Sequence, residues 1–177
     1  MSWQIRQIVI NLRCVSHGLK LLTHDGRILI VKTVKGNRLY KSEKLCSRTA
    51  ISKLFSDGRS VSAFPLRAVI RMEENTGHRQ HARFMISVPK KKIRKAVGRV
   101  LLRRRVREAY RLNRELLLPV LERCGMSVDI AFLYMDTNIA NYQVIEAKMK
   151  AMLGKMADIA EANRQRLEAE KDDNESD

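Results

Sequence analysis

The chain has 177 residues, a length typical of one domain with or without extensions. It holds 35 Lys and Arg residues against 19 Asp and Glu residues, which gives a formal net charge of +16, while 45% of its residues are hydrophobic. That apolar content excludes a disordered basic tail and is enough for a core. So much positive charge on a folded body predicts a polyanionic partner: nucleic acid first, an anionic membrane surface second.

Other protein classes are disfavoured by the same sequence. No run of about 18 apolar residues occurs, so no membrane-spanning helix is expected. The first residues contain no uninterrupted apolar segment, which predicts no signal peptide. The three cysteines, Cys14, Cys46 and Cys124, fit neither a disulfide framework nor a zinc site. Together these features predict a reduced, cytoplasmic compartment.

Residues 1–40 are predicted to be an N-terminal extension of uncertain order. Its first 37 residues contain one acidic residue, Asp25, and six basic residues. Within it, the apolar residues 28–31 favour a strand. The sequence assigns no role to this extension.

The first helix of the main domain is predicted over residues 47–55. Ser47 can cap its N-terminus, and Asp57-Gly58 closes it. Leu54 and Phe55 then share one face with Ile51. The main domain therefore begins with a helix that has one apolar side.

Three strands are predicted, over residues 66–72, 83–88 and 128–134. Residues 74–82 are polar and include a glycine, which predicts a hairpin connection between the first two strands. The two histidines of this connection are expected to be solvated loop residues and not metal ligands. The first strand alternates in polarity, which fits a sheet with one buried side.

The segment of residues 89–114 has the densest positive charge. Twelve of its 26 residues are Lys or Arg, and Glu108 is its single acidic residue. A solvated helix face normally mixes both signs, so this composition predicts polyanion binding.

From about Gly98 onward this segment has helical periodicity. One arc of the helix is apolar, formed by Leu102, Val106, Ala109, Tyr110 and Leu117. The neighbouring arc is an arginine ridge formed by Arg103, Arg104, Arg107, Arg111 and Arg114. Pro119 is expected to end or kink the helix.

A final helix is predicted over residues 142–170, with several methionines as core filler. Residues 157–177 are expected to be the helix end and an acidic, disordered tail. They hold eight acidic and three basic residues, a net charge of −5, so residues 1–156 carry +21. The order of elements predicts the α+β class, a small α–β sandwich with one covered sheet face and a main domain over residues 41–156.

Several stretches resemble the protein component of bacterial ribonuclease P. One is the helix with Ile51 and Phe55, followed by Gly58 and a strand after Pro65. Others are Ile-Ser-Val-Pro-Lys-Lys at 86–91, the arginine-rich run 99–111 and the strand 129–132. The resemblance covers roughly residues 41–156, and the combination is specific.

The resemblance implies a fold like that of a ribosomal protein domain and binding to a large catalytic RNA. It implies an endoribonuclease that removes the 5′ leader of precursor tRNA, with the chemistry and the Mg²⁺ ions held mainly by the RNA. The expected partners are that RNA and precursor tRNA, and neither a membrane nor DNA. The sequence agrees, because it contains no metal-ligand spacing, Gly-rich phosphate loop or nucleophile motif.

The resemblance and the charge pattern together select two sets of site residues. The RNA-binding set is Lys90, Lys91, Lys95, Arg99, Arg103, Arg104, Arg107 and Arg111. The set expected to line a cleft for the leader is Ile51, Phe55, Arg67 and Val69. For Phe55, base stacking and plain core packing remain equally open.

The sequence departs from the family pattern in two places. The signature of the arginine helix usually begins Arg-Asn-Arg, and here it reads Arg99-Val100-Leu101. The resemblance therefore assigns no RNA contact to Val100 or Leu101. The first helix commonly carries two phenylalanines one turn apart, and Ile51 replaces the first of them. One stacking platform is lost there, and an apolar contact is kept.

Two other functions remain open. The first is an RNA-binding or ribosome-associated module of similar fold, without a role in processing. The second is a membrane-surface protein that uses the basic helix. The membrane-surface function is disfavoured because the apolar residues of the basic helix are needed for the protein core, namely Leu102, Val106 and Tyr110.

Overall fold

The computed structural model describes residues 19–24, 27–32, 38–75, 77 and 81–174. The chain forms two compact units, Met1–Arg38 and Leu39–Asp177. In the first unit, strand β1 (Leu19–His24) pairs antiparallel with β2 (Arg27–Lys32). The strand predicted at residues 28–31 is therefore confirmed.

The second unit combines a four-stranded sheet with helices. Its elements are η2 (Lys41–Glu43), α2 (Arg48–Asp57), β3 (Arg59–Ala63), β4 (Leu66–Glu74), β5 (Ala82–Ser87), α3 (Ala96–Asn113), η3 (Arg114–Leu116), α4 (Leu118–Arg123), β6 (Met126–Tyr134) and α5 (Tyr142–Asn174). The sheet has the order β3-β4-β6-β5, in which only β5 and β6 are parallel. All three predicted strands and all three predicted helices are present.

The predicted hairpin between the strands now called β4 and β5 is wrong. β6 lies between them, so that Ile70 of β4 and Phe84 of β5 both oppose Ile130 of β6. Nearly every side chain of β6 is buried, which suits the centre of a sheet with both faces covered. The true hairpin joins β3 to β4 through a turn at Phe64-Pro65.

The connection between β4 and β5 is fastened to the start of β6. The Asn75 N–H donates to the Gly125 carbonyl at 2.8 Å, and the Val128 N–H donates to the His81 carbonyl at 2.8 Å. His81 is half-buried, and its Nδ1 lies 3.2 Å from the Met126 carbonyl oxygen. The expectation of a solvated loop residue is therefore wrong for His81, while His78 lies outside the described residues.

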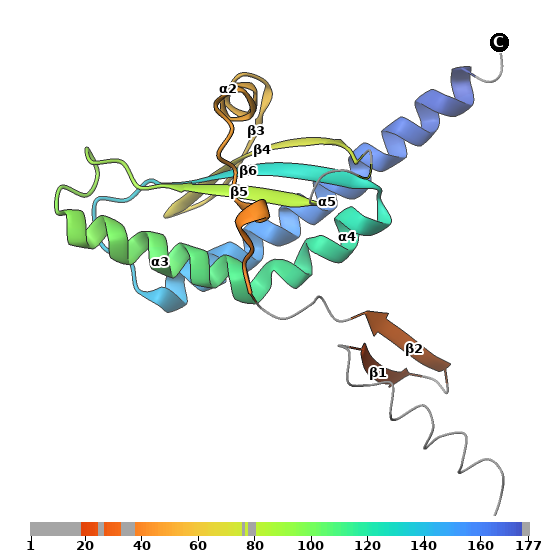
Figure 1. Cartoon of the computed structure of the whole chain (residues 1–177), viewed down its shortest axis with the longest axis horizontal. Coiled ribbons are helices and arrows are strands. Elements are labelled where there is room, and N and C mark those ends of the chain that lie inside the picture. Colours follow the sequence, from red (N-terminus) through yellow and green to blue (C-terminus); the bar gives the residue numbers. More distant parts are fainter. Residues whose placement is uncertain (1–18, 25–26, 33–37, 76, 78–80, 175–177) are drawn as a thin grey trace, which may run out of the picture. The chain divides into compact units, whose positions relative to one another are not determined.

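Helices cover both faces of the sheet, which corrects the expectation of one covered face. In Figure 1, α2 lies on one side of the sheet, and α3, α4 and α5 lie on the other. In the larger core, the rings of Phe84, Tyr110 and Phe132 contact one another, with centroids 4.5 to 6.4 Å apart. The smaller core, under α2, consists of Leu45, Leu54, Val69 and Ala131.

The basic helix ends earlier than Pro119. α3 stops at Asn113, a turn of 3-10 helix follows, and Pro119 lies in the first turn of α4. Proline is tolerated there because the first N–H groups of a helix have no partner within it. Leu117 and Leu121 are fully buried, so both sides of the break pack on the core.

The last helix, α5, packs against α3, α4, β3 and β4. Met149, Met152 and Met156 are fully buried, which confirms their prediction as core filler. The helix continues to Asn174, into the segment expected to be disordered. Residues 175–177 lie outside the described residues.

Candidate functional site

The centre of the candidate site is the outer surface of α3. Ala, Leu and Arg favour the helix, and Leu102, Val106 and Tyr110 fix its orientation by burial against the sheet. Three predicted arginines of α3 lie outside this buried stripe and are exposed, namely Arg103, Arg104 and Arg107. Within the described part of the chain, no carboxylate forms an ion pair with them. Their charge is therefore available to a polyanion.

The two remaining predicted arginines of α3 are engaged locally. Arg99 is half-buried, and its Nη1 donates to the carbonyls of Ile93 at 3.0 Å and Arg94 at 2.6 Å. Arg111 donates from Nε and Nη2 to the Glu108 carboxylate at 2.9 and 2.5 Å. These hydrogen bonds hold the pKa of the Glu108 carboxyl below its ordinary value. Arg99 and Arg111 thus have less freedom to reach a polyanion than their neighbours.

The predicted lysines lie at the approach to α3. Lys90 and Lys91 are exposed in the turn after β5, and Lys95 is the exposed residue that precedes the helix. Buried Ile93 anchors this turn, and its N–H donates to the Pro89 carbonyl at 3.1 Å. The exposed cations of the turn and of α3 are together called the α3 ridge: Lys90, Lys91, Lys95, Arg103, Arg104 and Arg107.

Arg114 is not part of this ridge, which corrects the sequence-based arc. Its side chain is 2% exposed and donates from Nη1 to the two Glu43 carboxylate oxygens at 2.8 and 3.0 Å. In the same region, burial raises the pKa of the Tyr110 hydroxyl, and the negative charge of Glu43 raises it further. The Arg114–Glu43 pair connects η2 to the end of α3. Helical periodicity alone could not predict this burial, because the partner lies 71 residues away in the sequence.

The second predicted surface lies at α2. Ser47 caps this helix, as predicted, with its Oγ 3.5 Å from the Ala50 N–H. Within α2, Leu54 faces the sheet and is fully buried, whereas Phe55 is 49% exposed. This exposure favours a surface role for Phe55 over core packing. Ile51 is half-buried and packs against the smaller core.

The two cleft residues predicted on β4 differ in exposure. Arg67 is exposed, and its Nε donates to Ser60 Oγ at 2.7 Å. Val69 is 7% exposed because α2 covers it. It therefore packs in the smaller core and does not line a surface cleft. Of the four predicted cleft residues, Phe55 and Arg67 are thus the exposed ones.

A charged row that the sequence pattern does not predict lies on the same sheet face. Arg71, Asp129 and Arg83 stand opposite one another on β4, β6 and β5. Arg83 donates from Nε and Nη2 to the Asp129 carboxylate at 2.8 and 2.7 Å. Arg71 pairs with Glu73 at 2.5 Å. The positive charges in this row are therefore balanced, unlike those of the α3 ridge.

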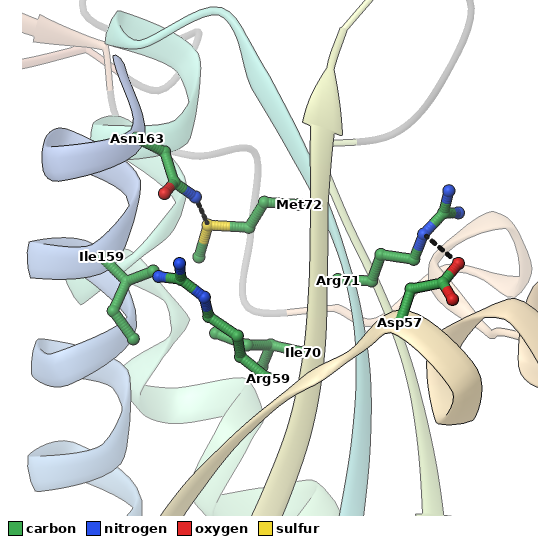
Figure 2. A pocket seen from close by; sticks show the side chains of 7 residues that line it. All are labelled: Asp57, Arg59, Ile70, Arg71, Met72, Ile159 and Asn163. Carbon is green, nitrogen blue, oxygen red and sulfur yellow. Dashed lines mark hydrogen bonds and ion pairs between the residues drawn. The ribbon is translucent and has the colours of Figure 1, made fainter. Parts of the chain in front are cut away.

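A pocket of about 220 Å³ is lined by residues of α2, β3, β4 and α5. Figure 2 shows Met72 and Asn163 directed toward each other between β4 and α5, with Arg71 and Asp57 on the other side of β4. Asn163 Nδ2 is 3.6 Å from Met72 Sδ. The pocket contains none of the predicted site residues.

The described residues hold no candidate metal site and no candidate membrane span. They contain no group of three or more His, Cys, Asp or Glu side chains able to hold a metal ion. Among the described helices, none is long and apolar enough to cross a membrane.

Comparisons with known proteins agree with this architecture. The family model of ribonuclease P matches residues 39–157. Ribonuclease P protein components of two Porphyromonas gingivalis strains are 37% identical over 120 residues, which cover 67% of this chain and 86% of each relative.

Two solved structures show the same fold. The RNase P protein of Staphylococcus aureus matches with a TM-score of 0.51 and 21% identity, over 66% of this chain and 96% of that one. The RNase P protein of Thermotoga maritima matches with a TM-score of 0.51 and 22% identity, over 64% and 96%. The predicted α+β fold is confirmed.

Proposed function

The chain belongs to the ribonuclease P protein family, and we propose that it is the protein subunit of the holoenzyme. In this role it binds the catalytic RNA and the 5′ leader of precursor tRNA, and it assists endonucleolytic removal of the leader. The observation that carries the proposal is the α3 ridge. Its six cations are exposed, and no carboxylate of the described residues forms an ion pair with them.

The ridge acts through phosphates. Arg103 and Arg107 are one helical turn apart, so they can follow an RNA backbone along the helix axis. Contacts of this kind supply affinity and orientation but read little sequence. Binding should therefore weaken steeply as salt rises.

The surface at α2 acts on the leader. An exposed aromatic ring stacks on any base, and leaders of many sequences have to be accepted. Phe55 supplies the ring, and Arg67 supplies a positive charge on the neighbouring strand. This division gives the catalytic RNA and the substrate separate surfaces on one small domain.

The chemical step belongs to the RNA in this proposal. Magnesium ions, held mainly by the RNA, supply the activation of water and the neutralisation of charge that hydrolysis needs. The protein's own residues hold and orient the RNA and the leader, and the complex acts in the cytoplasm.

Cleavage of precursor tRNA by the cognate RNA at low magnesium concentration tests the proposal. Added protein should accelerate leader removal and shift the magnesium dependence to lower concentrations. If the protein bound the RNA without accelerating cleavage, an RNA-binding module without a processing role would replace this proposal.

A further inference from the structure

The N-terminal half of α3 carries an exposed apolar surface that the α3 ridge does not explain. Val97, Val100 and Leu101 are 81%, 44% and 39% exposed. Their spacing of three and four residues places them on one side of the helix. Single exposed apolar residues are ordinary, but three neighbours on one helix face form a patch.

A second element extends this surface. Ile139, in the connection between β6 and α5, is 46% exposed. A Cβ atom at Gly98 would lie 3.0 Å from Ile139 Cδ1, so the absence of that atom lets Ile139 lie against α3. Gly98 is one turn before Leu101, which puts Ile139 at the border of the same surface. We call Val97, Val100, Leu101 and Ile139 the apolar patch.

Cations border the patch along the chain on both sides. Arg94 and Lys95 precede it, Arg103 and Arg104 follow it, and all four are exposed. Between residues 89 and 107 the sequence contains no acidic residue. An occupant of the patch should therefore combine an apolar surface with negative charge close by on two sides.

We propose that the apolar patch binds the face of an unpaired nucleobase of the RNA while the flanking cations hold the adjoining phosphates. A nucleotide in a single-stranded loop or bulge has this combination of base and phosphate, and proteins contact such bases when they are unstacked. Aliphatic side chains such as Leu, Ile and Met pack against bases in other nucleic-acid complexes. The proposal rests on the proposed function, because it assumes that α3 faces RNA. It also gives a role to Val100 and Leu101, the two positions that depart from the family signature.

The test replaces apolar contact area without changing charge. In Val97→Gln/Leu101→Gln, glutamine forms helix about as well as leucine and better than valine, so the helix is retained. Leu112→Gln, also on α3 and 40% exposed, is the matched control. Filter binding to the cognate ribonuclease P RNA should show a loss of about tenfold for the double variant, because apolar contact area is lost, and none for the control. The slope of affinity against salt should stay the same, because no cation is removed.

Chemical probing of the RNA bases identifies the contact itself. The wild type should protect an unpaired base that the double variant leaves reactive, while the phosphate protections remain. Equal affinity of the wild type and the double variant would overturn the inference, as would a lower melting temperature that accounts for the loss. A loss of binding to anionic vesicles, with RNA binding unchanged, would assign the patch to a membrane. Failure of the wild type to bind the RNA would instead refute the proposed function.

Discussion

Removing two arginines from the α3 ridge should change the salt dependence of RNA binding by a predictable amount. Six of the eight predicted RNA-binding side chains are exposed, whereas Arg99 and Arg111 are half-buried and hydrogen-bonded within the protein. Six phosphate contacts, at roughly −0.7 each, give a slope of about −4 in log K against log salt. In Arg103→Ala/Arg107→Ala four contacts remain, so the slope should fall to about −3.

Filter binding at a series of salt concentrations measures this slope. Near physiological salt the double variant should bind about tenfold more weakly than the wild type. Lys155→Ala/Arg166→Ala removes the same charge from α5, outside the ridge, and should leave the slope near that of the wild type. If both double variants flattened the slope equally, net charge and not the ridge would account for the binding.

Three further predictions concern individual side chains. Phe55→Ala should weaken binding of precursor tRNA by about tenfold and leave binding of mature tRNA unchanged. The melting temperature should also stay the same, because Phe55 is 49% exposed. Equal losses of binding for both tRNAs in a less stable protein would indicate core packing. Arg114→Ala leaves Glu43 without this partner and should lower the free energy of unfolding, measured in urea, by about 3–5 kcal/mol. Glu43→Met/Arg114→Met removes both charges and should recover much of that lost free energy. No recovery would refute the ion-pair explanation. In an NMR titration the Glu108 carboxyl should show a pKa below its ordinary value of 4.5, and Arg111→Ala should restore it. Since the folded-state pKa is lowered, the stability that this pair contributes is present above the ordinary value and is lost as the pH falls through the folded-state pKa.

Local patterns in the sequence predicted the helices well. The buried side of α3 follows directly from the spacing of Leu102, Val106 and Tyr110, and the methionines of α5 follow from the same period. β3 was missed because it is only five residues long and carries serines at two exposed positions. Short, polar edge strands give little periodic signal.

Contacts between distant segments were beyond the sequence pattern. The pairing of β4 and β5 with β6 depends on which strand needs burial on both faces, and sequence order favours a hairpin instead. Arg114 repeats the spacing of the ridge, yet its partner Glu43 precedes α2. For the candidate site, charge density along the sequence located the α3 ridge. The exposure of Phe55 and the burial of Val69 could not be predicted, because they depend on how α2 crosses the sheet.

The rate of leader removal by the cognate RNA at low magnesium, measured with three proteins, tests the central claim most directly. The wild type and Lys155→Ala/Arg166→Ala should accelerate cleavage of precursor tRNA at the mature 5′ end. At equal, limiting protein concentration Arg103→Ala/Arg107→Ala should accelerate cleavage much less near physiological salt and recover when the salt is lowered. Equal acceleration by all three proteins, or acceleration by none, would contradict the account.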